Sequence, residues 1–402
     1  MNAFDLDLTA LQQHLAEWGE PAYRARQVYA WLWSRGAGFE DMTNVPKRLR
    51  SRLAEGFSSE IDVVTEREAD GGATRKALLK FGGRHLVEAV LMGYPDRVTV
   101  CVSSQAGCAM GCGFCATGQM GLKANLGAGE IAAQVVWAVR ASSRLPSWTP
   151  QRVTNVVFMG MGEPLANYRA TRDAVCRMLD PAGMNLGARH VTVSTVGVVP
   201  GIRRLGNDHP QVGLAVSLHA AEDELRDRLV PVNRLWPLRE LESAVTWWRD
   251  RTGRRPSIEW AMIGGVNDSD RQASLLAPIA RRLKAHVNLI PLNPTPGWPA
   301  QPSAPQRMAG FVWTLRDAGV NVTVRDTRGR EIDAACGQLR WQFESSSEGD
   351  EGSTDRHEDL GSRRGPSGKL AFHGIADPAT TIPRHEEPVA VVGGEEHPVT
   401  SG

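Results

Sequence analysis

The chain has 402 residues, 42% of them hydrophobic and 23% charged, which is enough material for one large domain with additions. Its six cysteines are clustered or single, which argues against a secreted disulfide framework and favours a reducing cytoplasm. The opening MNAFDLDLTALQQHL lacks the layout of a signal peptide, and no apolar run approaches the roughly 18–20 residues of a membrane span. The sequence therefore predicts a cytoplasmic protein without a membrane segment.

The net charge of +1 conceals two oppositely charged parts of the chain. Residues 344–402 contain twelve Asp or Glu and five Lys or Arg, a net of −7, which leaves +8 for residues 1–343. A positive body suits a polyanionic partner such as RNA. A modest positive excess is also ordinary for soluble enzymes, so charge alone does not identify a partner.

Residues 1–62 are predicted to form a small N-terminal helical domain. Apolar residues recur at helical spacing over residues 23–33, and VPKRLRSRLAEGF is a second amphipathic segment. The basic residues of that segment, at positions 47–52, suit contacts with RNA phosphates, and a solvated basic face explains them equally well.

Residues 63–343 alternate between strand-like and helical segments. The strand-like runs are, in order, KALLKF, HLVEAVLMGY, RVTVCVSS, VTNVVFMG, HVTVSTV, VGLAVSLH, PSIEWAMI, HVNLIPLN and NVTVRD. From RVTVCVSS onward the runs are followed by a helical pattern or a Pro/Gly loop, which predicts an α/β fold whose six βα units form a partial (β/α) barrel. Residues 344–402 are rich in Gly, Pro, Ser and acidic residues without periodicity, and we expect a disordered acidic tail.

Three cysteines within eight residues form the most informative motif, CxxxCxxC at Cys108, Cys112 and Cys115. Three thiolates on one loop can hold a 4Fe-4S cluster and leave one iron open for a small molecule. A structural zinc site usually has four ligands in two separated pairs, and the remaining cysteines of this chain are single. We therefore expect a three-cysteine 4Fe-4S cluster, and the alternative is zinc completed by a histidine or a single cysteine.

Glycines and polar residues also lie where other strands of the predicted barrel end. They are GMGEP at residues 160–164, Ser194, the segment Ser217-Leu218-His219, and Asn293. Reacting groups of a parallel α/β barrel gather on loops at these strand ends. Each motif alone is a weak signal, because a Gly-Glu-Pro is usually a turn and a single histidine is usually structural. Together, glycines that permit close backbone approach, a carboxylate for an ammonium group, and hydroxyls for a ribose suit a charged amino-acid nucleoside.

These motifs resemble those of the radical S-adenosylmethionine (SAM) enzymes and, more closely, of the adenine methyltransferases of the RlmN/Cfr family. The matching blocks, in order over about residues 20–340, are CVSSQAGCAMGCGFCATG, VFMGMGEPLAN, VTVSTVGVVPGI, SLHA, HVNLIPLNP and RDTRGREIDAACGQL. The resemblance implies that Cys108, Cys112 and Cys115 hold the cluster, whose open iron binds the amino and carboxylate groups of SAM. It also implies further contacts to SAM, from Gly162 and Glu163 at its amino group and from Ser194, Ser217, Leu218, His219 and Asn293 along the rest of the molecule.

Three further residues acquire roles from this resemblance. Cys336 takes a methyl group from one SAM, and a second SAM is cleaved to a deoxyadenosyl radical that removes a hydrogen from the S-methyl group. The carbon radical then adds to adenine carbon 2. Glu88 corresponds to the family's proton acceptor, and Cys101 releases the product by forming a transient disulfide with Cys336. The sequence does not show whether Glu88 or Cys101 removes the proton from carbon 2. Cys176 lies inside an apolar run and is expected to be buried by packing.

The resemblance is closest to the RlmN branch and implies methylation of carbon 2 of an adenine in 23S ribosomal RNA, with a tRNA adenine as second substrate. The N-terminal helices then match an accessory domain that grips RNA, and a low-potential electron donor is required. An RNA base that is flipped out of its stack is recognised through single-stranded loops and phosphate contacts. Arg325, Arg328 and Arg330 are candidates for contacts to phosphates or to the base, and the alternative is that they form an exposed basic loop. The alternatives are the sister activity at carbon 8 and a non-catalytic iron–sulfur protein that binds RNA or senses redox state. The oligomeric state is open, with a monomer as the default.

Overall fold

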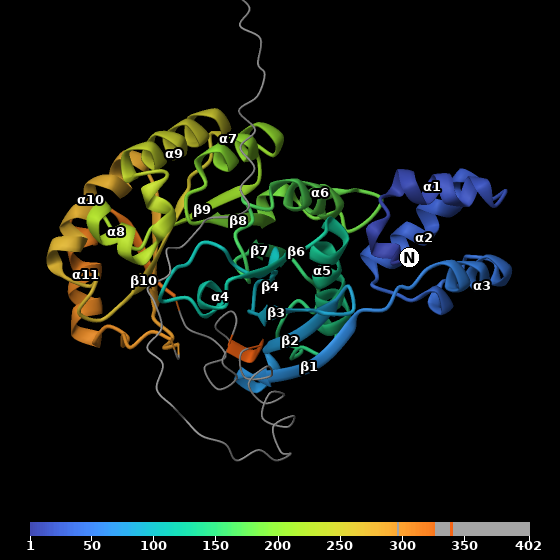
Figure 1. Cartoon of the computed structure of the whole chain (residues 1–402). Helices are drawn as coiled ribbons and strands as arrows, with labels where there is room; N and C mark the ends of the chain where they lie inside the picture. Colours follow the sequence, from blue (N-terminus) through green and yellow to red (C-terminus); the bar gives the residue numbers. More distant parts are fainter. Residues whose placement is uncertain (296, 326–337, 341–402) are drawn as a thin grey trace, which may run out of the picture. The chain divides into compact units, whose positions relative to one another are not determined.

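The computed structural model describes residues 1–295, 297–325 and 338–340. Cys336, Arg328, Arg330 and the expected disordered tail therefore lie outside the described residues. Figure 1 shows the described elements in chain order, from blue to red. No helix of the described part is long and apolar enough to cross a membrane.

The helices and strands of the described residues have the following bounds. The helices are α1 (Leu8–Glu17), α2 (Ala22–Ser34), α3 (Lys47–Gly56), α4 (Ala116–Gln119), α5 (Ala128–Ser142), α6 (Tyr168–Leu179), α7 (Val199–Asp208), α8 (Asp223–Leu229), α9 (Leu238–Thr252), α10 (Asp270–Leu283) and α11 (Pro305–Asp317). The strands are β1 (Asp62–Ala69), β2 (Thr74–Phe81), β3 (His85–Gly93), β4 (Val98–Cys101), β5 (Gln105–Gly107), β6 (Leu122–Asn125), β7 (Asn155–Phe158), β8 (Val191–Thr195), β9 (Gly213–Ser217), β10 (Ser257–Met262), β11 (His286–Pro291) and β12 (Asn321–Val324).

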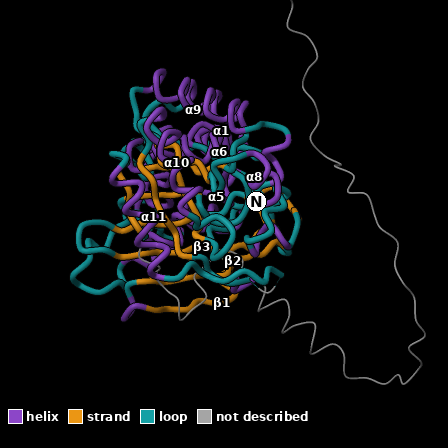
Figure 2. The backbone as a smooth tube through the Cα atoms, turned by 90° about the vertical axis from the view of Figure 1, so that its left-hand side faces the viewer, coloured by secondary structure: helices purple, strands orange, loops and turns teal. Residues whose placement is uncertain are grey.

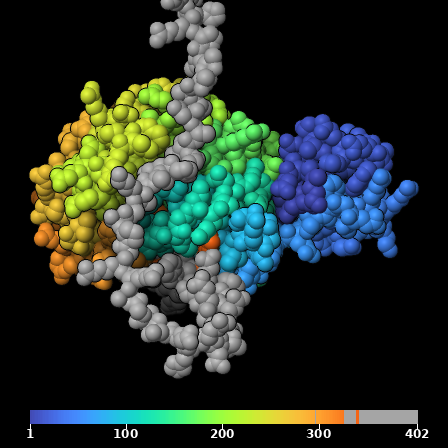
Figure 3. Space-filling model, in the orientation of Figure 1, coloured from blue at the N-terminus to red at the C-terminus, as the bar shows by residue number. Residues whose placement is uncertain are grey.

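Helices α1, α2 and α3 confirm that the N-terminal part of the chain is helical. Its buried side chains continue the hydrophobic core of the body and include an aromatic pair: Trp33 is fully buried and meets the ring of Phe4 edge-on, with 5.3 Å between the ring centroids. Arg177 of α6 donates a hydrogen bond to the carbonyl oxygen of Phe4 at 2.6 Å. Arg140 of α5 donates to the carbonyls of Gly36 and Ser59, so both α5 and α6 hold the N-terminal part, which Figure 3 shows in blue beside the green surface of the body.

The body is built on one mixed sheet with the strand order β1-β2-β3-β4-β7-β8-β9-β10-β11-β12. Strands β1 to β4 pair antiparallel, whereas β4 and the strands from β7 to β12 pair parallel. All nine runs that the sequence predicts as strands are strands of this sheet, and the predicted α/β architecture of six βα units is confirmed. The sequence analysis did not foresee β1 or the hairpin formed by β5 and β6.

Helices pack on the outside of the parallel strands, which Figure 2 shows as orange strands flanked by purple helices. Trp248 of α9, Trp260 of β10 and Phe311 of α11 are all fully buried in the layer between helices and sheet. The rings of Trp260 and Phe311 lie 5.7 Å apart. Because truncation of a buried aromatic side chain costs about 3–5 kcal/mol, this layer holds β10 firmly in the position from which it supplies site residues.

Cys176 corrects one expectation of the sequence analysis, because it is exposed rather than buried. Its helix, α6, turns Ala174, Val175 and Met178 toward the core. Cys176 lies beside this apolar stripe on the helix, and its sulfur is 4.0 Å from the imidazole of His209. The apolar run in the sequence indicated a buried face but not which of its residues occupied that face.

Candidate active site

A cavity of about 260 Å³ opens where the parallel strands end. Its walls come from the cysteine loop after β4, from the carboxyl ends of β7, β8, β9 and β11, and from Glu259 within β10, so it lies at the edge of the sheet where the sequence analysis expects a site. Of the residues predicted for the site, it is lined by Cys108, Cys112, Cys115, Gly162, Glu163, Ser194, Ser217 and His219.

The cysteine loop is closed by the β5–β6 hairpin, which pairs the residues before and after it. The amide of Cys108 donates to the carbonyl of Gly121 at 3.0 Å. Gly107 has a φ of +83°, and a Cβ at this position would lie only 1.9 Å from the oxygen of Gly121. A Cβ on Gly118 would meet the carbonyl oxygen of Cys112 at 2.7 Å. The glycines of this loop are therefore required for the tight turn that brings three cysteines to one cavity.

Burial dominates the chemistry of the thiols. Desolvation raises the pKa of Cys108 to about 12 and that of Cys112 well above its ordinary range. Iron binding has to displace these protons, since thiolates are the metal ligands. Within the described residues, no three His, Cys, Asp or Glu side chains have the arrangement that would hold a single metal ion. Three thiols that share one cavity fit a 4Fe-4S cluster, which is larger than an ion and needs one thiolate for each of three irons.

The GMGEP segment packs tightly against the strand that carries the cysteine loop. A Cβ on Gly162, whose φ is +95°, would lie 2.5 Å from the Cβ of Gln105. The carboxylate of Glu163 accepts hydrogen bonds from the amides of Leu165 at 3.0 Å and Val196 at 2.9 Å. Burial raises the pKa of Glu163 to about 7, against the effect of these bonds. Glu163 thus connects the end of β7 to the end of β8 as well as lining the cavity.

Ser194, Ser217 and His219 bring polar groups to the same cavity from β8 and β9. The two serine hydroxyls lie 3.3 Å apart. His219 has a φ of +61° and its Nδ1 accepts a hydrogen bond from the amide of Ala261 at 2.9 Å. Burial lowers the pKa of His219 to about 3, so the ring is neutral and carries its proton on Nε2. The ring can therefore offer an N–H donor and no positive charge.

The other two predicted SAM contacts, Leu218 and Asn293, are not among the residues that line this cavity. The side chain of Leu218 belongs to the hydrophobic core, and its amide donates to the carbonyl of Glu259 at 3.0 Å. Asn293 is half-buried beyond the end of β11. Its neighbour Pro294 accepts a hydrogen bond from Gln338 at 2.8 Å, so the last described residues reach this loop.

Glu259 is a cavity residue that sequence reasoning missed. It is 4% exposed, and its Oε1 accepts a hydrogen bond from Asn288 at 2.9 Å. Its Oε2 lies 3.9 Å from the guanidinium of Arg325 and has no hydrogen-bond partner among the described residues. Burial raises the pKa of Glu259, and Arg325 opposes that shift. The sequence signal that could have identified Glu259 is that it is the single acidic residue of the apolar strand IEWAMI.

Arg226 of α8 was also missed, and it joins the strand ends from behind the cavity. Its side chain is fully buried. The guanidinium donates to the carbonyl oxygens of Val196 and Leu218, and to the amide oxygen of Asn233 at 2.7 Å. Burial lowers the pKa of Arg226 to about 10, so the group is still charged at neutral pH. Its charge acts against the burial that raises the pKa of Cys112.

Glu88 and Cys101 lie outside this cavity, on the antiparallel part of the sheet. Cys101 is directly opposite Val90 in the β3–β4 pair, so Glu88, two residues from Val90, projects from the same face as Cys101. The carboxylate of Glu88 forms a buried ion pair with Lys76 at 2.8 Å and accepts the amide hydrogen of Arg340 at 2.7 Å. The third residue of the predicted set, Cys336, lies outside the described residues.

Comparison with known proteins places this chain among RNA-modifying enzymes. Residues 1–58 match the family model of the ribosomal RNA large subunit methyltransferase N-terminal domain, and residues 102–276 match that of the radical SAM superfamily. The probable dual-specificity RNA methyltransferase RlmN of Salinispora arenicola is 52% identical, covering 86% of this chain and 91% of the relative. The protein of the same description from Chloroflexus aurantiacus is 50% identical over 84% of this chain. A radical SAM methyltransferase from Sphaerobacter thermophilus has a solved structure with a TM-score of 0.80 and 49% identity, covering 85% of this chain and 99% of that one.

Proposed function

This chain belongs to the RlmN family of radical SAM RNA methyltransferases, and from that premise we propose that it methylates carbon 2 of an adenine in 23S ribosomal RNA and of an adenine in tRNA. The observation that supports this most is the convergence of the three loop cysteines with Gly162, Glu163 and the β8–β9 polar groups on one cavity. The reaction would take place in the cytoplasm, where both RNAs are available. Residues 1–62 would form an accessory RNA-binding domain, and residues 63–343 would form the catalytic body.

The cavity residues divide into two sets by chemistry. Cys108, Cys112 and Cys115 would hold the 4Fe-4S cluster, and Gly162 with the backbone of Glu163 would receive the SAM amino group. Hydroxyl and N–H donors on β8 and β9 would hold the ribose and adenine. When bound, the cluster would supply the radical chemistry, with electrons from a low-potential donor. Two SAM molecules would be consumed in each turnover, one as methyl donor and one as radical source.

Cys336 would act as the methyl carrier. Gln338 and Arg340 are tied to the carbonyl of Pro294 and the carboxylate of Glu88, respectively. In the sequence, Cys336 precedes Gln338 by two residues and Arg340 by four.

Glu88 and Cys101 would complete the reaction after the methylene carbon has joined the base. Glu88 would accept the proton lost from carbon 2, and Lys76 at 2.8 Å compensates the negative charge of its carboxylate. The Cys101 thiolate would then attack the sulfur of Cys336 and break the sulfur–carbon bond, the methylene carbon would take up a proton to become the methyl group, and the unpaired electron of the adduct would return to the electron carrier that supplied it. This leaves a disulfide that cytosolic thiols reduce.

The position of methylation is tested by mass spectrometry of nucleosides from RNA treated with the enzyme. We expect 2-methyladenosine, and 8-methyladenosine would instead assign the sister activity. Cys101→Ala is expected to accumulate protein joined covalently to RNA, whereas Cys336→Ala is expected to form no adduct. A Cys101→Ala enzyme with normal turnover would refute the proposed release step.

A further inference from the structure

A second, strongly basic hollow lies at the other end of the parallel strands. It has a volume of about 720 Å³ and is built from the residues that end α9 and α10 and begin β10, β11 and β12. Its cations are Arg249, Arg254, Arg255, Arg281 and Lys284, and its single acid is Asp250. We call this set the basic hollow. Its net charge of +4 is large for one surface feature of a chain with a total charge of +1.

The basic hollow is separate from the cysteine cavity. Arg254, Arg255 and Lys284 precede strands whose opposite, carboxyl ends carry the cavity. Four residues separate Arg255 of the hollow from Glu259 of the cavity, so the two linings come within about 13 Å of each other along β10 at a rise of about 3.3 Å per residue. The hollow therefore cannot contact the reacting groups, and a role for it has to be a binding role.

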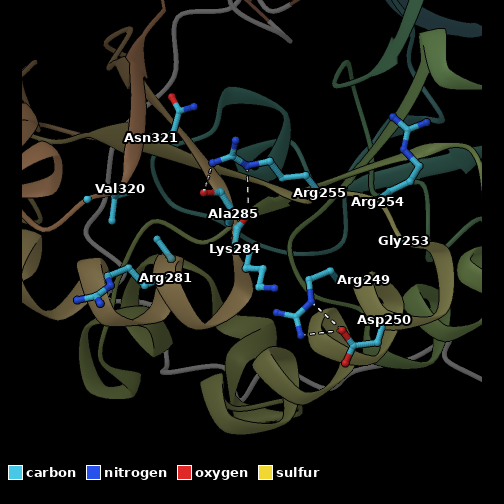
Figure 4. A pocket seen from close by; sticks show the side chains of 12 residues that line it. Arg249, Asp250, Gly253, Arg254, Arg255, Arg281, Lys284, Ala285, Val320 and Asn321 are labelled. Atoms are coloured by element: carbon cyan, nitrogen blue, oxygen red, sulfur yellow. Dashed lines mark hydrogen bonds and ion pairs between the residues drawn. The ribbon is translucent and has the colours of Figure 1, made fainter.

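Helix-end stabilisation accounts for only some of these cations. Basic side chains are favourable near the carbonyl groups that end a helix. Figure 4 shows Arg255 reaching the carbonyls of Lys284 and Ala285, at 3.1 and 3.4 Å, and Arg249 turned toward Asp250. Arg249 also donates to the carbonyl oxygen of Arg282 at 2.6 Å, so both arginines bind carbonyl groups at the end of α10.

Arg281 and Lys284 have no such explanation. Both side chains are exposed, and within the described residues neither forms a hydrogen bond or an ion pair. On the other side of the hollow, Arg254 and Arg189 both donate to Gln211, which brings two like charges together without an acid between them. Beyond burial, the charge of Arg189 lowers the pKa of Arg254. Uncompensated like charges cost free energy, and an anionic ligand would remove that cost.

We propose that the basic hollow binds backbone phosphates of the RNA substrate, in a segment outside the loop that carries the target adenine. The two uncompensated side chains are exposed and lie three residues apart at the end of α10, which suits an extended polyanion rather than a small enclosed anion. The electron donor is less suited to this surface, because it has to approach the cluster at the other end of the strands. The proposal rests on RNA being the substrate and does not depend on which adenine carbon is methylated.

The test is RNA binding by the double variant Arg281→Gln/Lys284→Gln, measured by fluorescence anisotropy without turnover. The probes are a full-length unmodified tRNA transcript, an rRNA fragment, and a short oligonucleotide that carries only the target loop. Each lost phosphate contact lowers the slope of log K against log salt by about 0.7–0.9, so we expect the slope for the long probes to fall by about 1.4–1.8 and their affinity to fall several-fold. The short oligonucleotide should bind unchanged.

Arg282→Gln is the matched control. It removes one positive charge, against two in the double variant, from the exposed position next to Arg281, but Arg282 is already paired with Glu242 at 2.7 Å and does not line the hollow. We expect no change in the slope for this variant and full binding by Arg281→Lys/Lys284→Arg, which keeps both charges.

Three results would overturn the proposal. They are unchanged binding of the long probes by the double variant, an equal loss for Arg282→Gln, and an equal loss for the short oligonucleotide. Binding of inorganic phosphate that depends on Arg281 and Lys284, with RNA affinity unchanged, would assign the hollow to a small anion instead. Because nucleoside analysis measures the methylated position separately, failure here leaves the proposed function standing.

Discussion

Replacing Arg226 by methionine should destabilise the protein strongly, because this side chain joins the strand ends behind the cavity. Its guanidinium supplies Val196, Leu218 and Asn233 with hydrogen bonds. Methionine fills a similar volume without a donor, so three buried oxygens lose their partner at about 1–3 kcal/mol each. Removing the desolvated charge returns part of that cost. We expect the free energy of unfolding to fall by about 3–5 kcal/mol, the range for breaking a buried charged interaction.

Urea denaturation of identically prepared variants measures this loss. Arg228→Met is the matched control, since Arg228 lies two residues further on the same helix, is exposed, and forms no hydrogen bond or ion pair within the described residues. Its effect should stay within about 0.5 kcal/mol. Arg226→Lys should give an intermediate loss, because an ammonium lacks the planar fork of the guanidinium. A loss below about 1 kcal/mol for Arg226→Met would refute the reasoning.

A second readout separates the charge of Arg226 from its hydrogen bonds. A positive charge beside Cys112 favours the reduced, more negative form of a cluster bound there. Arg226→Met should therefore shift the reduction potential to more negative values, and Arg226→Lys should retain most of the wild-type potential. A redox titration followed by electron paramagnetic resonance measures this, and an unchanged potential in the methionine variant would exclude an electrostatic role.

The remaining predictions concern the cluster ligands, a histidine and the tail. Anaerobically prepared protein should contain about four irons per chain, and alanine at Cys108, Cys112 or Cys115 should remove both iron and activity; stoichiometric zinc without iron would contradict this. Burial lowers the pKa of His219 to about 3, so unfolding takes up a proton at this residue between that value and about 6.5, and its contribution to stability falls by about 2 kcal/mol from pH 7 to pH 5, whereas the raised pKa of Glu163 acts in the opposite direction. In urea titrations, the stability difference between wild type and His219→Asn should therefore change by about 2 kcal/mol over this range. A difference that does not change with pH would exclude a lowered pKa at His219. Deleting residues 344–402 removes seven net negative charges and should leave iron content intact while slightly tightening RNA binding, as anisotropy can measure; loss of iron would place the domain boundary elsewhere.

The central parallel strands were predictable because they are buried on both faces and read as short apolar runs, whereas the edge strand β12 is mostly exposed. Strand β1 gave no such signal: its sequence, DVVTEREA, is charged and largely exposed, as suits an edge strand. Its position is set by antiparallel pairing with β2, a contact between segments that local patterns do not encode. The β5–β6 hairpin, with three and four residues in its strands, is too short to produce a periodic signal.

In the candidate site, too, the residues defined by local sequence were predictable, and those defined by contacts between distant segments were not. The cysteine loop and GMGEP were predictable because their chemistry is encoded in adjacent residues. Glu259 and Arg226 were not, because each is defined by partners on other elements: Asn288 and Arg325 for the first, and the ends of β8 and β9 for the second. A charged residue inside an apolar strand, or on a short helix after a strand end, indicates that it has a buried partner, but the sequence does not show which residue that partner is.

Two buried charged residues, Glu163 and Arg226, support the ends of the barrel strands. Glu163 accepts amide hydrogens from the loops after β7 and β8, and Arg226 donates to carbonyls after β8 and β9. Val196 bonds to both side chains: its amide donates to the carboxylate of Glu163, and its carbonyl accepts from the guanidinium of Arg226. Since the two charges act through one peptide segment, changes at Glu163 and Arg226 should not be additive in stability, and a double-mutant cycle would measure that coupling. An interaction energy near zero would mean that each strand end is held independently.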